Sequence, residues 1–376
     1  MAFWEQSLFS EPYDVIIIGA GMVGLSAGIH YLKICPGSSV MILEKNSFSA
    51  GASVRNAGFA CYGSPTELIA EIKIYGEEHV FRLFEERYKG IQDLITLTGL
   101  KQIDYQNTGG HEIIHPLFSQ EKITTDQLAH LNSQIATITG TQHYFKISKD
   151  SPERFGFQGF SNIIYNDQEA LLHPAKLLLR LCDIYRSLGG DIRFGDALTS
   201  WHDQGNLKEL SCKSGLKLRG HKILFATNEY TPDFIPEIKS IPARNQVILI
   251  RPEKPVIFSG CFHIDRGFIY FRNLSEYILI GGGRQMDMDR EFTREKGEND
   301  TIINFLTNLL RENIIPGQRF DIVDQWSGII SFSPSNIPSI QIIQPGVVVA
   351  TNLGGIGVAL GYPCGKSAAE FLCMVD

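Results

Sequence analysis

The stretch that most constrains this chain is residues 14–28, which read DVIIIGAGMVGLSAG. The β-branched run at residues 15–18 suits a strand buried on both faces, and the glycines after it predict a sharp turn into a helix. Gly19 allows the turn, Gly21 lets the backbone approach a pyrophosphate, and Gly24 lets the helix pack closely on the strand. The spacing therefore predicts a dinucleotide site, with the phosphates at the N-terminus of the helix.

An acidic residue supports this interpretation. The next apolar run, residues 39–43, ends at Glu44, which lies 44 − 24 = 20 residues after Gly24. An acid at that distance accepts hydrogen bonds from a ribose and disfavours a 2′-phosphate. The motif does not choose between FAD and NAD, so an NAD-dependent Rossmann enzyme and a glycine turn without a ligand both stay open here.

Composition excludes several other classes. The 376 residues are many for one domain and comfortable for two, and 43% hydrophobic with 20% charged residues describes an ordinary globular protein. The net charge of 34 − 41 = −7 provides no global basic field for nucleic acid or an anionic membrane. The seven cysteines are odd in number and form no CxxC pair, which favours reduced thiols over a disulfide framework or a metal site.

The segment at residues 1–14 has neither a basic n-region nor a long apolar run, so we expect no signal peptide. No segment reaches the ~18 consecutive apolar residues of a membrane span. These patterns predict a cytoplasmic protein with no membrane span and no metal; the oligomeric state is left open.

Periodicity separates two kinds of sequence along the chain. A loop rich in small residues, 46–64, follows Glu44 and suits a ligand wrapper. From residue 242, aromatic and β-branched runs split by turns predict an antiparallel sheet. Helices are expected at residues 68–97, 124–138, 170–188, 299–311 and 366–373, and further strands at 191–194, from 221, and at 346–350.

Seven blocks together resemble the D-amino-acid-oxidase-like family of FAD-dependent oxidoreductases, which includes sarcosine, glycine and γ-glutamylputrescine oxidases. The blocks follow the family's order over nearly the whole chain. They are GAGMVGLSAG with Glu44, GASVRNAGFA, LHPAKLL, FATNEYTP, YFRN with ILIGGG, WSGIISFSPSNIP, and NLGGIGVALG.

The resemblance implies an α/β fold with a discontinuous Rossmann-like FAD-binding domain, at residues 1–75, 150–235 and 325–376. A second α+β domain, built on an antiparallel sheet, would provide the substrate or cap domain from residues 76–149 and 236–324. The implied activity is oxidation of a C–N bond of a small amine or amino acid by hydride transfer to FAD. Oxygen or another acceptor would then take the electrons.

By position in the family's blocks, the resemblance also implies which residues contact FAD: the pyrophosphate at the first turn, the ribose at Glu44, and the flavin at the closing turn. They are Gly19, Gly21, Met22, Val23, Gly24, Glu44, Lys45, Ala52, Ser53, Arg55, Asn56, Ala57, Gly58, Leu198, Ala226, Thr227, Gly328, Gly355, Ile356, Gly357, Val358, Ala359 and Leu360. No cysteine lies in residues 326–338, so FAD is expected to be held without a covalent bond. Cys61 is interpreted as a small apolar residue.

Departures from the family's pattern leave the substrate open. Ile330 stands where amino-acid-oxidising members often carry an arginine that holds the substrate carboxylate, and Ala359 stands where sarcosine oxidases have a lysine. Ser335 and Ile356 replace an aspartate and a histidine. A 2-hydroxy-acid dehydrogenase stays open because some members of the family oxidise such acids, and the residues at Ile330 and Ala359 also leave open a flavin-binding subunit or sensor with little catalysis.

Three side chains are candidates for the catalytic site. Tyr270 and Arg272 lie two residues apart in FIYFR and so share a face of a strand, where the tyrosine would offer a hydroxyl and the arginine would replace the missing carboxylate anchor. Arg55 is a substrate anchor or, as we favour, a brace for the phosphates. The alternative for Tyr270 is an ordinary tyrosine of the sheet, and the alternative for Arg272 is a charge that faces solvent. His173 before Pro174 predicts a helix cap.

Overall fold

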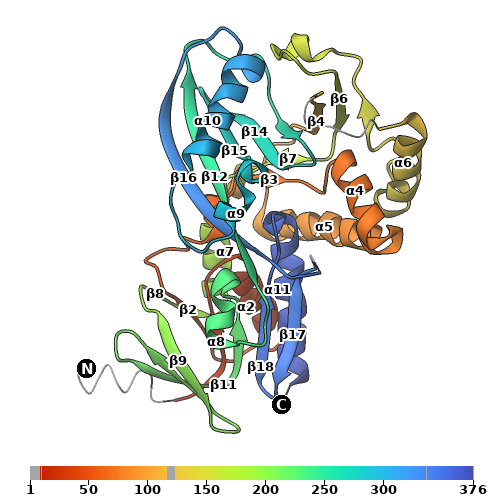
Figure 1. Cartoon of the computed structure of the whole chain (residues 1–376). Helices are drawn as coiled ribbons and strands as arrows, with labels where there is room; N and C mark the ends of the chain where they lie inside the picture. The colour runs from red at the N-terminus through yellow and green to blue at the C-terminus, as the bar shows by residue number, and fades with distance from the viewer. Residues whose placement is uncertain (1–8, 10, 117–122, 336, 376) are drawn as a thin grey trace.

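A computed structural model describes residues 9, 11–116, 123–335 and 337–375 of this chain. Two eight-stranded sheets form the frame, one in the lower half of the molecule and one in the upper half (Figure 1). The last helix, α11 (Gly357–Met374), runs along the lower half and begins at the junction of the two halves. The predicted α/β fold is confirmed, and the site described below lies where the two sheets approach each other.

The lower sheet is of the doubly wound type. Its order is β17-β18-β11-β1-β2-β8, and β18, β11, β1, β2 and β8 run parallel. The predicted first strand is confirmed as β1, whose last four residues are fully buried because helices or loops cover both faces. The strands are β1 (Tyr13–Ile18), β2 (Val40–Glu44), β8 (Asp191–Phe194), β9 (Leu198–Asp203), β10 (Lys208–Cys212), β11 (Lys217–Phe225), β17 (Ser339–Gln344) and β18 (Val347–Thr351).

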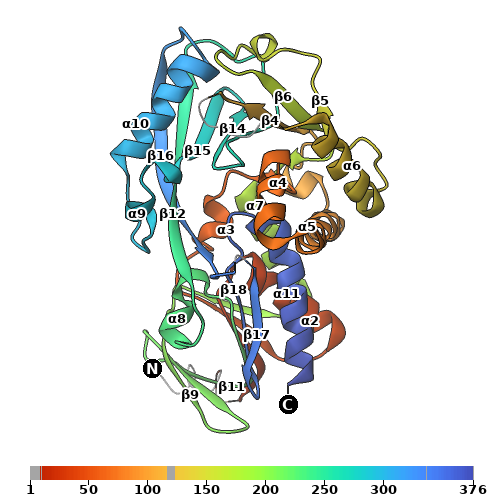
Figure 2. The same cartoon turned by 45° about the vertical axis from the view of Figure 1, so that its right-hand side comes forward.

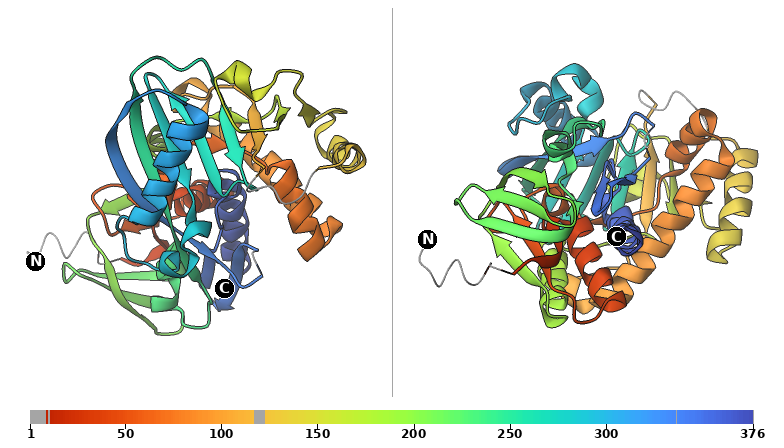
Figure 3. Two further views of the ribbon diagram at one scale, coloured as in Figure 1. Left: turned by 45° about the horizontal axis from the view of Figure 1, so that its top comes forward. Right: turned by 90° about the horizontal axis from the view of Figure 1, so that it is seen from below.

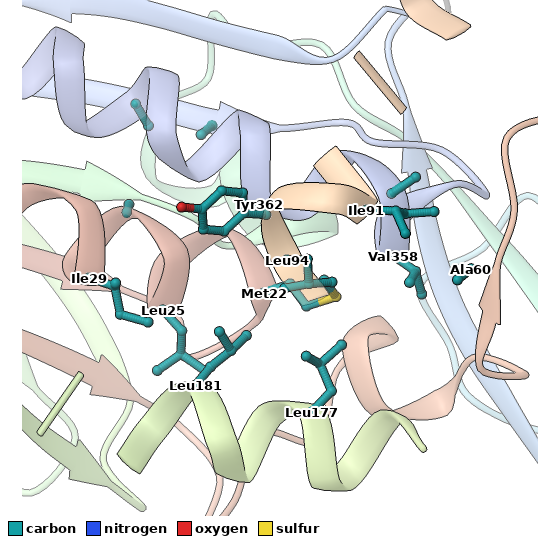
Figure 4. Packing of buried hydrophobic residues seen from close by; sticks show 14 of the residues in the cluster. Met22, Leu25, Ile29, Ala60, Ile91, Leu94, Leu177, Leu181, Val358 and Tyr362 are labelled. Atoms are coloured by element: carbon teal, nitrogen blue, oxygen red, sulfur yellow. The ribbon is translucent and has the colours of Figure 1, made fainter. Parts of the chain in front are cut away.

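Four helices bury one face of this sheet in a single core. Figure 4 shows Met22, Leu25 and Ile29 of α2 (Met22–Ile34) packing toward Leu177 and Leu181 of α7 (Pro174–Ser187). Residues of α11 and of α5 (Glu77–Thr98) complete the cluster. Gly24 has the role predicted for it, because a Cβ atom there would overlap the carbonyl oxygen of Gly19.

The upper sheet is antiparallel over most of its width, as predicted from the runs after residue 242. Its order is β16-β12-β15-β14-β13-β4-β6-β5, and α10 (Asp300–Leu309) packs on its outer face through an apolar cluster. The strands are β4 (Gly110–Ile114), β5 (Lys146–Ile147), β6 (Asn162–Asn166), β12 (Ile241–Pro252), β13 (Cys261–Ile264), β14 (Ile269–Leu274), β15 (Tyr277–Gly282) and β16 (Phe320–Phe332).

Short elements connect these parts. Figures 2 and 3 show α4, α5 and α6 on the flank of the molecule opposite α10. The remaining elements are α3 (Ala52–Arg55), β3 (Phe59–Ala60), α4 (Pro65–Tyr75), η1 (Lys101–Ile103), α6 (Thr125–Thr139), η2 (Pro152–Phe155), β7 (Ala170–Leu171), η3 (Asn228–Tyr230), α8 (Thr231–Phe234), η4 (Arg284–Met286), α9 (Met288–Glu291) and the π-helical η5 (Leu310–Ile314).

The sheet topology corrects the domain boundaries expected from the sequence. β6 falls in the range 150–235 and most of β16 in the range 325–376, yet both strands pair in the upper sheet. Conversely, α5 falls in the range 76–149 but packs into the core of the lower sheet. The reason is that strand pairing and helix packing join segments that are distant in the chain, which periodicity does not report.

One helix begins later than expected. Residues 170–171 form β7, which pairs with β3, and α7 begins at Pro174 rather than at residue 170. Proline is favoured at the first helical position, and the side chain of His173 accepts a hydrogen bond from the amide of Lys176. The predicted capping role of His173 is therefore confirmed.

Candidate active site

A cavity of about 460 Å³ lies at the carboxyl ends of β1 and β2, where ligands bind in open α/β sheets. The β1–α2 turn, the loop after β2, the segment after β11 and the start of α11 line it. Gly19 adopts φ +107, a conformation that favours glycine, and a Cβ atom there would lie 2.5 Å from the carbonyl oxygen of Ala226. Glycine at residue 19 therefore lets the chain after β1 approach the chain after β11 at the edge of the cavity.

Glu44 lies at one end of this cavity and is held in place. Its Oε2 accepts a hydrogen bond from the amide of Ala20 at 3.0 Å, and its Oε1 accepts from the amide and side chain of Asn46. Each carboxylate oxygen can accept two hydrogen bonds, so Oε1 is fully used and Oε2 keeps one position for a ribose hydroxyl. This is the arrangement expected of a ribose-binding acid.

The long helices α2 and α11 begin at the cavity, and the first amide of α2, that of Met22, donates to Oγ of Ser53 at 3.1 Å. The residues at their N-caps are Gly21 for α2 and Ile356 for α11, and neither provides a capping hydrogen bond. A Cβ atom on Gly355 or Gly357 would meet no protein atom, so the backbone that enters α11 is bare. Amide groups at such helix starts stabilise an anion or a polar ring edge, so the chain fits the phosphates and flavin of FAD.

A second cavity of about 390 Å³ continues from the first toward the upper sheet. The two share eight lining residues, which makes them one continuous site: Ala52, Arg55, Asn56, Ile330, Leu353, Gly354, Gly355 and Val358. The shared residues come from the small-residue loop, from β16 and from the closing turn. A dinucleotide anchored at Glu44 would therefore present its far ring to the second cavity.

One row of residues across the upper sheet forms a wall of the second cavity. Val247 pairs with Gly281, Gly281 with Tyr270, and Tyr270 with His263, on the adjacent strands β12, β15, β14 and β13. Residues paired in register point to the same face of a sheet. Val247, Tyr270 and His263 all line the second cavity, so this face is the one turned toward the lower half.

Tyr270 lines the second cavity, and its role as a substrate-facing hydroxyl stays a prediction. Its ring lies over Gly281, where an added Cβ atom would be 2.7 Å from Cε2 and 2.8 Å from the hydroxyl. Phe59 contacts the ring edge to face, with the ring centroids 5.9 Å apart. Burial raises the pKa of Tyr270 to about 12, so the phenol stays neutral and can donate a hydrogen bond.

His263, which is part of this wall, forms a pair with Glu169, which lines neither cavity. The Nε2 atom of His263 lies 3.1 Å from Oε2 of Glu169, and the carboxylate side chain is 1% exposed. Burial alone would lower the pKa of His263, but the carboxylates of Glu169, Glu112 and Glu67 raise it above its ordinary value. Gly110 permits the pairing, since a Cβ atom there would overlap the carboxylate of Glu169.

Arg284, which directly follows β15 and its glycines, brings a cation into the second cavity. Its Nη1 donates to Oδ1 of Asn245 at 3.2 Å, and its guanidinium lies 4.8 Å from the ring of Phe268 and 5.2 Å from that of Phe332. Among residues 9, 11–116, 123–335 and 337–375, no carboxylate lies within 4.0 Å of it. Burial lowers the pKa of Arg284, as expected for a desolvated cation.

The sequence predicted that the guanidinium of Arg272 would face the site, and this prediction is wrong. Arg272 does not line either cavity; its Nη1 donates to the carbonyl oxygens of Ala57 and Leu172 at 3.1 and 3.2 Å. It ties β14 to the small-residue loop and is 5% exposed, so it is neither a carboxylate anchor nor a solvent-facing charge. Arg272 and Tyr270 share a face of β14, but the arginine side chain is long enough for its guanidinium to reach carbonyl oxygens outside the cavity.

Arg55 lines both cavities but uses its donors on the backbone. Its Nε donates to the carbonyl oxygen of Ala50 and its Nη1 to that of Ser327, at 3.1 and 3.0 Å. The indole of Trp326 donates in turn to the carbonyl oxygen of Arg55. These contacts connect α3 to β16 and favour a bracing role over contact with substrate.

Of the residues expected to contact a cofactor, all line one of the two cavities except Gly24 and Gly58. Both exceptions are packing positions: a Cβ atom on Gly58 would overlap the carbonyl oxygen of Leu172. Ala57, Gly328, Ile356, Ala359 and Leu360 line only the second cavity. The predicted cofactor set therefore divides into a nucleotide part and a ring part.

The far end of the second cavity is charged and internally paired. Arg87 of α5 forms ion pairs with Glu67 at 3.3 Å and Glu71 at 3.7 Å, both on α4. Glu112 accepts hydrogen bonds from the hydroxyls of Ser64 and Thr66. In the described part of the chain, no group of three or more His, Cys, Asp or Glu side chains could hold a metal ion, and no helix there is long and apolar enough to cross a bilayer.

Sequence analysis missed Arg284 and His263, although a signal for the histidine was present. The β13–β14 hairpin turns at Asp265 and Arg266, which both have positive φ, so counting outward from CFHIDRGFIYF pairs His263 with Tyr270. For Arg284 the sequence carried no comparable signal, because the residue enters the cavity only through the turn that begins at Gly283, φ +77.

Comparisons with known proteins agree with this geometry. The family model described as FAD dependent oxidoreductase (DAO) matches residues 14–371. Similar solved structures include L-proline dehydrogenase from P. horikoshii (TM-score 0.74, 14% identity, 97% of this chain and 94% of that chain), glycine oxidase from Bacillus cereus (0.72, 17%, 96% and 97%) and iminodiacetate oxidase from Chelativorans sp. (0.72, 16%, 96% and 96%). No curated protein matches the sequence significantly. At these identities the structures show a shared fold.

Proposed function

Because the chain belongs to the DAO family of FAD-dependent oxidoreductases, we propose that it oxidises the C–N bond of a small amine that carries a carboxylate. The observation that carries this proposal is the continuous site, in which a nucleotide cavity opens onto a second cavity lined by Tyr270 and the unpaired Arg284. The similar structures are named for oxidation of proline, glycine and iminodiacetate, all amines with a carboxylate, which supports the same class here.

The chain's own residues divide the work of holding FAD. Glu44 would bind the ribose, the amides at the start of α2 together with Ser53 would bind the pyrophosphate, and the backbone at Gly355 and Gly357 would bind the edge of the flavin ring. When bound, FAD supplies the acceptor for the hydride that leaves the substrate carbon. The chain excludes water from that place with apolar side chains, among them Ile330, Val247 and Leu360.

We propose that FAD is held without a covalent bond. Cys61 is the cysteine that lines the second cavity, and burial raises its pKa well above the ordinary value. A buried neutral thiol is a poor nucleophile. Acid precipitation of the yellow protein should leave the flavin in the supernatant; colour that stays in the pellet would contradict this.

We propose that Arg284 binds the substrate carboxylate and that Tyr270 donates a second hydrogen bond to it. Phe268 and Phe332 both lie close to the guanidinium, and stacked aromatic contacts leave its edge for hydrogen bonds, an edge that matches a carboxylate. A desolvated cation without a counter-ion gains most from such a ligand. The proposed carboxylate-binding arginine therefore comes from the end of β15, whereas amino-acid-oxidising members of the family often carry it at the position of Ile330 on β16.

Benzoate tests this anchor without turnover, because it should perturb the flavin absorption spectrum while the neutral benzamide should not. Arg284→Met should weaken benzoate binding by about tenfold or more, as expected for loss of a charged hydrogen bond of 1.5–3 kcal/mol. Arg251→Met is the matched control, because that arginine lies on the far part of β12, where it bonds the hydroxyl of Tyr277. Equal weakening by both substitutions would remove Arg284 from the site.

The main experiment is an anaerobic screen in which amines, amino acids and 2-hydroxy acids are added to the purified yellow protein. Bleaching by an amino acid supports the proposal, and bleaching only by hydroxy acids would replace it with a 2-hydroxy-acid dehydrogenase. A flavin that none of them bleaches would favour a flavin-binding subunit or sensor. Repeating the assay with oxygen or an artificial dye identifies the electron acceptor, which we expect to be one of these two kinds.

We further propose a cytoplasmic location, because the seven cysteines are free.

A further inference from the structure

The Glu169–His263 pair has the arrangement of an oriented proton acceptor. Glu169 is buried in the segment before β7, and His263 provides its hydrogen-bond partner among the described residues. The bond engages Nε2 and leaves Nδ1 of the imidazole without a partner in the described part of the chain. A carboxylate on one ring nitrogen fixes the tautomer, so the other nitrogen carries a lone pair when the ring is neutral.

The position of His263 connects this pair to the substrate side of the site. His263 lines the second cavity and is paired in register with Tyr270, so their Cβ atoms lie about 5 Å apart. Phe59 contacts both rings, with centroid distances of 5.3 Å to His263 and 5.9 Å to Tyr270. A substrate held by Tyr270 and Arg284 would therefore lie within one residue's width of the imidazole.

A group that accepts a proton here would assist oxidation of an amine. A small amine is an ammonium ion at neutral pH, and hydride loss from the adjacent carbon requires the nitrogen lone pair to be free. Of the titratable side chains around His263, Tyr270 and Cys61 stay protonated because burial raises their pKa, and Arg87 is a permanent cation. Among the described residues, the titratable and charged groups near His263 include Glu169, Glu112, Glu67, His111, Cys61, Tyr270 and Arg87.

We propose that His263, oriented by Glu169, accepts the proton of the substrate ammonium before oxidation; this rests on the proposed function. An N–H bond of the ammonium breaks, an N–H bond forms at Nδ1 of His263, and the electron pair stays on the substrate nitrogen. The imidazolium is then stabilised by the carboxylate of Glu169 and later returns the proton to water. Glu169 is a positioning residue, and His263 is the catalytic one.

The neighbouring charges set the working range of this base. Because Glu169, Glu112 and Glu67 raise the pKa of His263, it is protonated at low pH and accepts a proton only above that pKa. The rate of flavin reduction should therefore rise with pH through the pKa of His263. Glu169→Gln removes the nearest negative charge, lowers that pKa, and should move the rise to lower pH, a shift that general damage to the fold would not produce.

The test combines an NMR titration of the His263 ring in the yellow protein with the pH profile of anaerobic flavin reduction by the best amine of the screen. We expect the NMR pKa and the midpoint of the profile to coincide, and His263→Gln to slow reduction about 100-fold or more. His202→Gln is the control, since His202 lies on β9 of the lower sheet, lines neither cavity and should leave the midpoint unchanged.

Three results would overturn the proposal: a midpoint that differs from the NMR pKa, a midpoint that Glu169→Gln raises or leaves unmoved, or full reduction rates in His263→Gln. The comparison of NMR pKa and midpoint needs no variant, so it decides even if a substituted protein fails to fold. If an amine reduces the flavin at a rate that does not depend on His263, only the role of His263 as the base is overturned. A flavin that no amine reduces overturns the proposed function, and the base with it.

Discussion

Gly281 should control the position of Tyr270, and Gly281→Ala tests this directly. A Cβ atom at residue 281 would lie 2.7 Å from the ring of Tyr270, whereas ordinary contacts begin at 3.4 Å, so the ring must retreat by 3.4 − 2.7 = 0.7 Å. The ring cannot retreat through the sheet, so it moves into the second cavity that it lines. Overpacking of this kind costs about 1–3 kcal/mol, and we expect the lower part of that range because the cavity gives room.

Two assays separate the effects of this substitution. Urea unfolding should show a loss of about 1 kcal/mol, and benzoate binding, followed by the flavin spectrum, should weaken several-fold because the displaced ring narrows the cavity. The matched control is Tyr270→Ala, which removes the ring. In that background Gly281→Ala should have almost no further effect on either measurement, since nothing remains for the new methyl group to displace.

The outcome of this double-mutant cycle is decisive. If Gly281→Ala lowers stability and binding equally in the presence and absence of the Tyr270 ring, the methyl group acts on the backbone of β15 and not on the tyrosine. If it has no effect in the wild-type background, the ring does not lie over Gly281 as described. Either result would refute the placement of Tyr270 in the cavity wall.

Three further predictions concern the cofactor, pH and the buried ion pair. Glu44→Gln should raise the dissociation constant of FAD about tenfold, measured by flavin fluorescence, because it replaces a charged acceptor with a neutral amide; an unchanged constant would exclude ribose binding by Glu44. Since the pKa of His263 is raised, its pairing with Glu169 stabilises the fold below pH 6.5 and loses this effect as pH rises through the higher pKa, so the difference in unfolding free energy between wild type and Glu169→Gln should shrink with rising pH. Glu291→Gln should cost about 3–5 kcal/mol in urea unfolding, because Arg244 would be left buried without the carboxylate that it contacts at 2.7 Å; a loss below 1 kcal/mol would contradict this.

The first half of the site could be predicted from the sequence because its residues are close together in the chain. The turn through Gly19 and Gly21 and the acid at Glu44 follow from strand, turn and helix geometry, which depends on local sequence. The structure places these residues around one cavity, as expected. The closing turn at Gly355 follows the same local rule.

The second half could not be predicted in the same way. Tyr270 was found by alternation along one strand, but the same reasoning assigned the neighbouring Arg272 to the cavity, where its guanidinium does not lie. His263 lies on the neighbouring strand β13, and its pairing with Tyr270 could be found only by counting outward from the hairpin turn. Arg284 reaches the cavity from the turn after β15, a placement that no spacing in the sequence reports.

Glycine conformations and apolar periodicity are properties of short segments, so the sequence was sufficient to predict a nucleotide-binding βαβ unit and a separate antiparallel sheet. Which charged side chain lines the second cavity depends on the tertiary structure. The guanidinium of Arg272 is bound by two backbone carbonyls, whereas that of Arg284 lies near two aromatic rings, with no carboxylate within 4.0 Å among the described residues. Long side chains bond to whatever packing brings near them, and packing is set by the whole chain.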